Sequence, residues 1–555
     1  MSLKPEPLPP IPEQTARVAR TVCPKGSLCL WIGDELSAVF QDELFAALFP
    51  RRGQPAEAPW RLALVTVLRF VEGLSDRQAA EAVRTRIDWK YALRLDLEDL
   101  GFDFSVLCEF RARLLQGGGE ALVFEKLLAQ AKEQGWLKAR GRQRTDSTHV
   151  LAAIETLSRL ECVAETFRQA LNVLSATVPE WVQAHVPVEW YERYATRWQD
   201  YRLPSGRQER QGLAEMIGQD GRRLFALLEE TPQLSWVRHV PAVETLRQVW
   251  VQQFYADEDT ARWREAKDLP ASSLLICTPY DSDARYSTKR STTWTGYKVH
   301  LTESCDDEAP HLITDVQTTP APQCDSDMTL PIEQSLQAHH LLPSVLLLDQ
   351  GYVTADYLLS SQETYQVDLV GPIATNPSWQ TRSQAGFGAA DFEIHWLEQY
   401  AICPQGCRSV QWYSNQNSHG QDTIQIRFAA TDCTPCAVRS WCTQAATLPR
   451  TVRVRSQQVC DALEKARTRQ QTPEFKAVYA KRAGIEGTLS QGVRAFGLRR
   501  SRYIGEAKTH LQHLMIASAL NLARLFAWSQ GQPLEHTRRS CFAALAPASL
   551  AVANK

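Results

Sequence analysis

The chain has 555 residues, enough for three or four domains of about 150 residues each, and its 44% hydrophobic and 22% charged content is ordinary for a globular protein. Its formal net charge of −2 excludes a protein that coats a polyanion through its total charge, as histones do. The charge is unevenly placed, however, because residues 450–510 hold fourteen bases against five acids. This surplus indicates a polyanion partner at least as strongly as a solvated basic face.

Residues 1–20 begin with a Pro-rich segment that has no apolar run, so we expect a flexible tail and no secretory signal. The best apolar run, Leu514–Trp528, carries Asn521 and Arg524 and does not predict a membrane span. The expected location is therefore cytoplasmic. In that compartment the fourteen cysteines are interpreted as thiols or metal ligands and not as disulfides.

Residues 21–138 have the pattern of a helical domain. The stretch LSDRQAAEAVRTRIDWKYALRL shows apolar residues three and four apart, with Ser75 as the N-cap. Two interpretations are open: a DNA-binding helix-turn-helix, or a plain helical bundle, which is the commoner use of such a pair. QGGGE at residues 116–120 predicts a loop.

Asp146 lies in residues 139–154, in a polar patch directly before the apolar run Val150–Ile154. Such an Asp is more often a helix cap than a metal ligand, and Ser147 and Thr148 also suit a cap. Residues 155–270 then return to long amphipathic helices that carry no chemistry we can name.

Strand signals dominate residues 271–373. TGYKVHLTES alternates apolar and polar residues, which predicts a half-buried strand, and HLITDVQTT predicts a second one. In SVLLLDQGYV a continuous apolar run ends in Asp349 and a turn, which is how a buried strand delivers a carboxylate to the ligand-binding edge of a sheet. A turn-capping Asp is the alternative. A helical segment around Ile332 and Leu336 precedes this strand, and VDLVGPI, residues 367–373, completes a βαβ unit.

Residues 374–470 are polar, rich in short strands and hold five cysteines, with Cys403 and Cys407 in CPQGC, Cys433 and Cys436 in CTPC, and then Cys442. Paired thiols in a reducing compartment suit a structural, tetrahedral zinc ion. Five candidates for four places leave the choice open, and unmetallated buried thiols are the alternative.

Residues 471–530 begin with Thr472 as an N-cap and Pro473 at the first helical position. Tyr479, Arg482 and Glu486 are three and four residues apart, which places them along one edge of a single helix. The apolar stripe beside them comprises Phe475, Val478, Ile485, Leu489 and Val493. The sequence therefore predicts that Glu486 leans toward the interior or a cleft; a half-buried salt bridge with Arg482 is the alternative. Residues 531–555 are expected to form a tail.

Three acids, Asp146, Asp349 and Glu486, thus stand at two predicted strand ends and on an inward helix face. Carboxylate oxygens are the ligands that Mg²⁺ or Mn²⁺ prefers. Two such ions could activate a nucleophile and stabilise the leaving oxygen in phosphodiester cleavage.

Long motifs add a resemblance to this interpretation. They are RTDSTHVLAAI, PYDSDARYSTKRSTTWTGYKVHLTES, HLITDV, LLLDQGYV and AGIEGTLSQGVRAFGLRRSRYIGEAKTHLQH. Together they resemble the DDE transposases of bacterial insertion sequences, most closely the insertion-sequence eleven-eighty-two group of the IS-four-like branch. The resemblance implies an α/β fold: a ribonuclease-H-like catalytic core with a helical insertion, a strand-rich cysteine-bearing insertion, and an N-terminal all-helical domain.

Carried over residue by residue, the resemblance makes Asp146, Asp349 and Glu486 the catalytic metal ligands, 203 and 137 residues apart. Tyr479, Arg482 and Glu486 match a tyrosine-arginine-glutamate signature of the branch. The lysine expected seven places after the glutamate is absent, since Val493 stands there, and Arg494 follows as a substitute. The implied DNA contacts are Tyr479, Arg482, Arg494, Arg499, Arg500, Arg502 and Lys508. The implied zinc ligands are Cys403, Cys433, Cys436 and Cys442, with Cys407 as an extra thiol.

The expected function is therefore that of a transposase which binds the terminal inverted repeats of its own element through residues 21–138, cuts at their ends and joins them to target DNA. Two Mg²⁺ or Mn²⁺ ions, double-stranded DNA and a homodimer in the synaptic complex are implied. Two other classes remain: a ribonuclease-H-like DNA nuclease without transposition, and a catalytically inactive DNA-binding relic.

Overall fold

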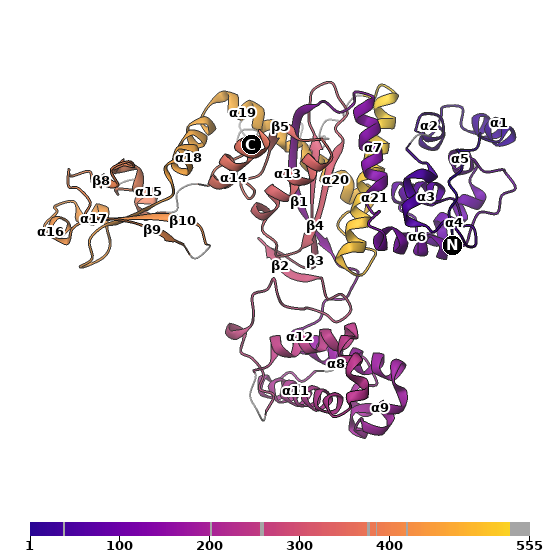
Figure 1. The fold of residues 1–555 in the computed structure, drawn as a ribbon, viewed down its shortest axis with the longest axis horizontal. Helices are drawn as coiled ribbons and strands as arrows, with labels where there is room; N and C mark the ends of the chain where they lie inside the picture. Colours follow the sequence, from indigo (N-terminus) through magenta and orange to yellow (C-terminus); the bar gives the residue numbers. More distant parts are fainter. Residues whose placement is uncertain are drawn as a thin grey trace. The chain divides into compact units, whose positions relative to one another are not determined.

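A computed structural model gives the structure of the chain and describes residues 1–36, 39–199, 203–255, 260–374, 378–383, 386–417, 420–532 and 545. The chain divides into two compact units, whose elements are labelled in Figure 1. Unit 1 comprises Met1–Lys138, Asp146–Gln323 and Ile485–Lys555, and unit 2 comprises Ala139–Thr145 and Cys324–Gly484. Apart from residues 531, 532 and 545, the tail predicted for 531–555 lies outside the described residues.

The N-terminal part of unit 1 is helical, as predicted. Its α-helices are α1 (Glu13–Val22), α2 (Leu28–Glu35), α3 (Pro59–Val71), α4 (Asp76–Thr85), α5 (Ile87–Ala92), α6 (Ser105–Gln116) and α7 (Leu122–Glu133). Ser75 caps α4 through a capping box with Gln78, and the predicted loop lies between α6 and α7. The flexible tail expected for residues 1–20 is wrong. Ser2 is buried and its amide donates to the Gln54 carbonyl at 2.7 Å, and in α1 Thr15 and Ala19 are fully buried, with Thr15 Oγ1 donating to the Leu95 carbonyl at 2.9 Å.

The helix-turn-helix interpretation of α4 and α5 is also wrong. Only Arg86 separates the two helices, whereas that motif needs a turn of about three or four residues. In α5, Trp89 and Tyr91 are fully buried and Lys90 is nearly so. A helix enclosed in this way cannot lie in a DNA groove, so the pair belongs to a helical bundle.

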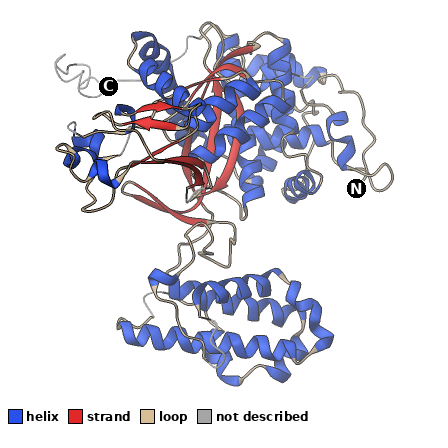
Figure 2. Cartoon of the chain, turned by 60° about the vertical axis from the view of Figure 1, so that its left-hand side comes forward, coloured by secondary structure: helices blue, strands red, loops and turns tan. Residues whose placement is uncertain are grey.

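A second helical segment of unit 1 follows β1. It contains α8 (Arg159–Thr177), α9 (Pro179–His185), α10 (Val188–Tyr194), α11 (Arg207–Glu229) and α12 (Pro241–Gln253). These helices enclose a core of their own in which Phe167, Trp190 and Trp250 are buried, and Figure 2 shows the segment as a bundle of helices. The long helices predicted for residues 155–270 are therefore confirmed.

The strands of unit 1 are β2 (Arg285–Lys289), β3 (Thr292–Ser304), β4 (Ile313–Pro320) and the second part of β1 (Arg140–Leu151). Antiparallel pairing joins β3 to β2 and β4, and β1 is the other neighbour of β3. The half-buried pattern predicted for β3 is wrong, because its polar residues are buried as well. They have partners inside the protein: Lys298 Nζ donates to the Gln323 carbonyl at 2.6 Å, and His300 Nε2 lies 3.4 Å from Thr319 Oγ1.

One face of β4 is covered by the long helix α21 (Glu506–Ser529). The Asn521 side chain accepts from the Ile313 amide and donates to the Ile313 carbonyl, both at 2.8 Å, so both the oxygen and the nitrogen of this buried side chain have a partner. Although α21 has 24 residues, no helix among the described residues has the length and apolar character required to span a bilayer.

In unit 2, the first part of β1 pairs in parallel with β5 (Pro343–Leu347), and β5 pairs in parallel with β6 (Asp368–Val370). Helix α13 (Thr329–Ala338) buries Ile332 and Leu336 before β5, and α14 (Ala355–Ser360) lies between β5 and β6 in the chain. The predicted strand–helix–strand arrangement is confirmed.

The strand-rich segment predicted for residues 374–470 is also present in unit 2. Its elements are α15 (Trp379–Ser383), β7 (Glu393–His395), β8 (Tyr400–Ile402), β9 (Gln411–Gln416), β10 (Asp422–Arg427), α16 (Ala430–Cys433), α17 (Arg439–Cys442), β11 (Thr451–Val454) and α18 (Gln457–Gln470). Strands β9, β10 and β11 form an antiparallel sheet with β10 in the middle, and β7 pairs with β8. A small core containing Phe392, Ile426 and Phe428 supports the segment.

The single helix predicted from Thr472 onward is interrupted. Thr472 caps α19 (Pro473–Ala480) as predicted, accepting from the Phe475 amide at 3.2 Å, but a 3-10 turn at Lys481–Ala483 separates α19 from α20 (Gly484–Phe496). Because the helical period is broken at this turn, the face predicted from Tyr479 to Glu486 does not continue into α20.

Candidate functional site

The three acids lie in three different local settings. Asp146 lies within β1 and not at its end, is half-buried, and accepts from the Ser147 amide at 2.7 Å. A position inside a strand excludes the helix-cap interpretation. Asp349 follows β5 by two residues, is half-buried, and accepts from the Gln350 amide at 2.8 Å at the start of a turn.

Glu486, in the first turn of α20, is exposed, so the predicted interior position is wrong and a position in a cleft stays a prediction. The buried positions of α20 are Ile485, Thr488, Leu489, Gly492 and Phe496. Glu486 follows Ile485 by one residue and is therefore rotated about 100° from the centre of this face.

In unit 1, the chain after α20 is bonded to the end of β1. The Leu151 amide donates to the Arg499 carbonyl at 2.8 Å, and the Ser501 amide donates to the Leu151 carbonyl at 2.9 Å. Arg499 Nε also donates to Thr148 Oγ1 at 2.7 Å. The residues that follow Asp146 are thus fixed to the residues that follow the helix of Glu486.

In unit 2, the chain before Asp146 is bonded to the chain before Glu486. Arg144 is buried, and its Nη1 donates to the Lys481 carbonyl at 2.6 Å. A Cβ atom at Gly484 would lie 2.0 Å from the same nitrogen, so glycine leaves the room that the guanidinium occupies. The residues before Asp146 are therefore bonded to the chain just before α20, and the residues after it to the chain just after α20.

The helix α20 is also anchored to β3 by a buried ionic network. Glu303 is fully buried, and its Oε2 accepts from Thr488 Oγ1 at 2.5 Å and from Arg524 Nη1 at 2.8 Å, while Arg524 Nη2 donates to Thr488 Oγ1 at 2.6 Å. The register of β3 against β4 shifts between Thr302 and Glu303, and such a bulge redirects a side chain. No local sequence motif reveals this network, because its three members lie in separate segments of the chain.

The predicted DNA contacts have varied environments. Arg494, Arg499, Arg500 and Lys508 are exposed, whereas Tyr479 and Arg482 are half-buried. Tyr479 stacks on Phe475, with ring centroids 5.6 Å apart. Arg502 already has backbone partners, since its Nη1 donates to the Leu74 carbonyl at 2.6 Å and its guanidinium lies 5.1 Å from the centre of the Phe70 ring. Burial and the neighbouring Arg69 lower the pKa of Arg502.

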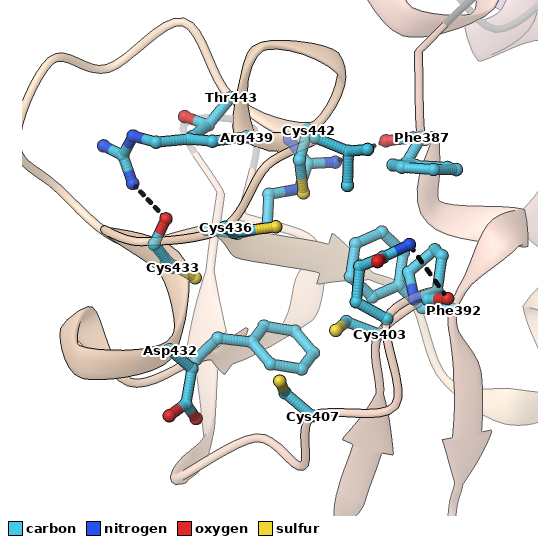
Figure 3. Close-up of a pocket in the computed structure, with 15 residues that line it drawn as sticks. Phe387, Phe392, Cys403, Cys407, Asp432, Cys433, Cys436, Arg439, Cys442 and Thr443 are labelled. Carbon is cyan, nitrogen blue, oxygen red and sulfur yellow. Dashed lines mark hydrogen bonds between the residues drawn. The ribbon is translucent and has the colours of Figure 1, made fainter.

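Five cysteines line one cavity of unit 2 (Figure 3): Cys403, Cys407, Cys433, Cys436 and Cys442. All five are free thiols. The walls include Phe387, Phe392 and Phe428, and burial raises the pKa of the Cys442 thiol. Cys407, predicted to be an extra thiol, lies in the same cavity as the four predicted ligands.

The donor types suit metal ions, with carboxylates for Mg²⁺ and thiolates for zinc. Among the residues that the structure describes, however, no three Asp, Glu, His or Cys side chains are grouped closely enough to hold a metal ion. These side chains are thus of the types that bind such metal ions, but in the described part of the structure they do not lie close enough together to bind one.

Two family models match the chain. One, described as "Transposase DDE domain", matches residues 402–526, and the other, described as "Transposase domain (DUF772)", matches residues 31–113. The first range includes Glu486 and the five cysteines, and neither range includes Asp146 or Asp349. No curated protein matches the chain.

These matches support a DDE transposase, and they point to nucleotidyl transfer on DNA with divalent metals such as Mg²⁺. The mixed α/β architecture with its helical N-terminal region is consistent with a ribonuclease-H-like core.

Proposed function

We propose that this protein is a transposase of the insertion-sequence eleven-eighty-two group, in the IS-four-like branch, and that Asp146, Asp349 and Glu486 are its catalytic carboxylates. The observation that carries the proposal is the double attachment of β1: Arg144, before Asp146, is bonded to Lys481 ahead of α20, and Thr148, after Asp146, is bonded to Arg499 beyond α20. Catalytic side chains must be held in position, and these attachments restrict the movement of the strand that carries Asp146.

The strand register supports the inclusion of Asp349. Paired residues of β1 and β5 are 203 positions apart in the sequence, as in Arg142 with Val345 and Arg144 with Leu347. Asp146 and Asp349 are also 203 positions apart. This equal spacing supports the inclusion of both carboxylates among the proposed catalytic residues.

The chemistry would proceed in two balanced steps. Water attacks a phosphodiester at the element end, and the bond to the departing 3′ oxygen breaks, which leaves a 3′ hydroxyl and a 5′ phosphate. That 3′ hydroxyl then attacks a target phosphodiester, forming one P–O bond as another breaks. Two Mg²⁺ or Mn²⁺ ions, when held by the three carboxylates, supply the activation of the nucleophile and the charge stabilisation. Within the chain, Arg494, Arg499, Arg500 and Lys508 are exposed bases suited to phosphate contact, beside the half-buried Tyr479 and Arg482.

We assign residues 21–138 to binding of the terminal inverted repeats, with the helical segment and the strand-rich segment as insertions in the core. Synapsis of two ends calls for at least a dimer on DNA.

The deciding experiment is Mg²⁺-dependent cleavage of a duplex that carries the element ends, compared between the wild type and Asp349→Asn. We expect Asp349→Asn to lose about 3 kcal/mol of transition-state stabilisation, which lowers the cleavage rate about a hundredfold. Asp368→Asn is the matched control, since Asp368 pairs with Arg469 at an exposed position. Equal cleavage by Asp349→Asn and the wild type would overturn the assignment.

The substrate separates the proposal from its competitors. Cleavage that does not need element ends would identify a nuclease of the same fold. Binding to the ends without any cleavage, unchanged by the Asp349 substitution, would identify a DNA-binding relic.

The second proposed metal site is the cysteine cavity. Cys403, Cys433, Cys436 and Cys442 are the proposed ligands of a structural zinc ion, which needs all four as thiolates. The common cavity and the free state of these thiols support the assignment. Zinc content of the purified protein should fall from about one per chain to near zero in a Cys433→Ser and Cys436→Ser double variant, with Cys324→Ser, an exposed thiol elsewhere, as the control. Unchanged zinc content would reject the site.

A further inference from the structure

The antiparallel sheet of β9, β10 and β11 has two chemically different faces. On one face the register aligns Trp412 with Ile426 and Val452, and the next row on the same face aligns Ile424 with Val454. Ile426 and Val452 are almost completely buried in the small core of this segment. The part of this face around Ile426 and Val452 therefore packs on the core, and its far end at Ser414, Gln416 and Asp422 is exposed.

The opposite face, which we call the outer face, is polar throughout. Its three rows are Gln411, Arg427 and Thr451; Tyr413, Gln425 and Arg453; and Asn415 with Thr423. These rows contain no carboxylate. Side chains alternate between the two faces along a strand, and this alternation places Asp422 on the same face as Ile424 and Ile426. Tyr413 is 42% exposed and Arg453 is exposed, so the surface is open to a partner.

The polar side chains are partly fixed in place. Tyr413 Oη donates to Gln425 Oε1 at 2.9 Å across the strands, and Thr423 Oγ1 donates to the Asn415 carbonyl at 3.1 Å. Side chains held on a sheet lose less conformational freedom on binding than free ones do.

The two arginines of the outer face differ from Arg455 and Arg469 of the same segment in their partners. Arg455 pairs with Asp356, and Arg469 pairs with Asp368, whereas Arg427 and Arg453 have no acidic partner among the described residues. They sit diagonally on adjacent strands, so their Cα atoms are separated by about 7–8 Å. Both guanidinium groups can therefore face one charged partner.

We propose that the outer face is a binding surface for double-stranded DNA. Two guanidinium groups without acidic partners match a polyanion in charge, and they suit phosphate oxygens in geometry. The amides of Gln411, Asn415 and Gln425 donate and accept at base edges and sugars, and strands are among the elements that read DNA grooves. The proposal rests on the proposed function, which supplies DNA as the partner.

The test measures the affinity of the full-length chain for a labelled duplex carrying the element ends, at several salt concentrations. We compare the wild type with the Arg427→Ala and Arg453→Ala double variant. Loss of two phosphate contacts makes the slope of log K against log salt shallower by about 1.8 and weakens binding at every salt concentration. Arg408→Ala is the control, since this exposed arginine of the same segment stacks on Tyr400 and lies outside the rows of the outer face.

The outcomes separate this inference from the proposed function. A wild type that does not bind the duplex would remove the proposed function itself. A wild type that binds, together with a double variant of equal affinity and slope, would overturn the outer-face inference alone. An equal loss of affinity in Arg408→Ala would also overturn it, because binding would then depend on the positive charge of the segment and not on the outer face. Matching thermal melting curves for all variants would show that the losses do not come from unfolding.

Discussion

Replacement of Glu303 by Ala tests whether α20 is held in place by the buried network. Glu303 is fully buried, and the Arg524 side chain that donates to it is only 16% exposed. Removal of the carboxylate leaves a guanidinium group nearly buried without its counter-charge, which costs about 3–5 kcal/mol. Removal of the exposed Arg469 partner, by Asp368→Ala, costs only about 0–1 kcal/mol, because solvent screens that pair.

Two measurements follow the effect of Glu303→Ala. Urea unfolding monitored by tryptophan fluorescence gives the change in the free energy of unfolding, and hydrogen exchange of the α20 amides shows whether this helix loosens. Since Thr488 also loses its acceptor, we expect faster exchange in α20 and weaker DNA cleavage, although Glu486 itself is unchanged.

A second variant separates charge from packing. Glu303→Met combined with Arg524→Leu removes both charges and fills the site with apolar groups, so stability should return to within about 1 kcal/mol of the wild type. A cost for Glu303→Ala no larger than that of Asp368→Ala would refute the reasoning.

Three further predictions concern acidity, the cysteine cavity and the contact of Arg502. Burial lowers the pKa of His513 from 6.5 to about 3, so the folded state resists protonation and loses stability as the pH falls below about 6.5; at pH 5 the loss is about 2 kcal/mol. The midpoint of urea unfolding should therefore fall between pH 7 and pH 5, and His513→Asn should make this fall smaller. An equal fall in the variant would contradict the attribution of the pH effect to His513. Because zinc displaces thiol protons, we expect the zinc affinity of the cavity to fall with decreasing pH, as competition with a zinc-binding dye would show; a pH-independent affinity would exclude thiolate ligation. Arg502→Ala removes the hydrogen bonds to the Gly73 and Leu74 carbonyls and should cost about 1 kcal/mol, with faster hydrogen exchange at the start of α4. Arg500→Ala should have little effect, because among the described residues the Arg500 side chain has no hydrogen bond.

The transposase assignment changes how the basic surplus at residues 450–510 is understood. The sequence treats all fourteen bases alike, but the structure separates them. Arg455 and Arg469 form ion pairs with aspartates, and Arg502 donates a hydrogen bond to a backbone carbonyl. Within the part of the chain that the structure describes, Arg453 of the outer face has no acidic partner, so we expect a DNA surface in this range to be built from a subset of these bases.

Local chemistry in the sequence was enough to predict several elements. Ser75 and Thr472 begin helices because their hydroxyl groups accept from the first backbone amides, and no distant residue is needed for that. The apolar run before Asp349 and the alternation of apolar and polar residues in β3 likewise predicted two strands. Both signals depend only on the residue types within a few positions of each other.

Only the tertiary structure decided how those elements are used. The position of Arg144 against Gly484 accompanies the break between α19 and α20, and the partners of Glu303 come from segments 185 and 221 residues away. The exposure of Glu486 and the burial of both faces of β3 depend in the same way on which segments pack against them. Burial and ion pairing arise from contacts between residues far apart in the chain, and a local pattern carries no information about those contacts.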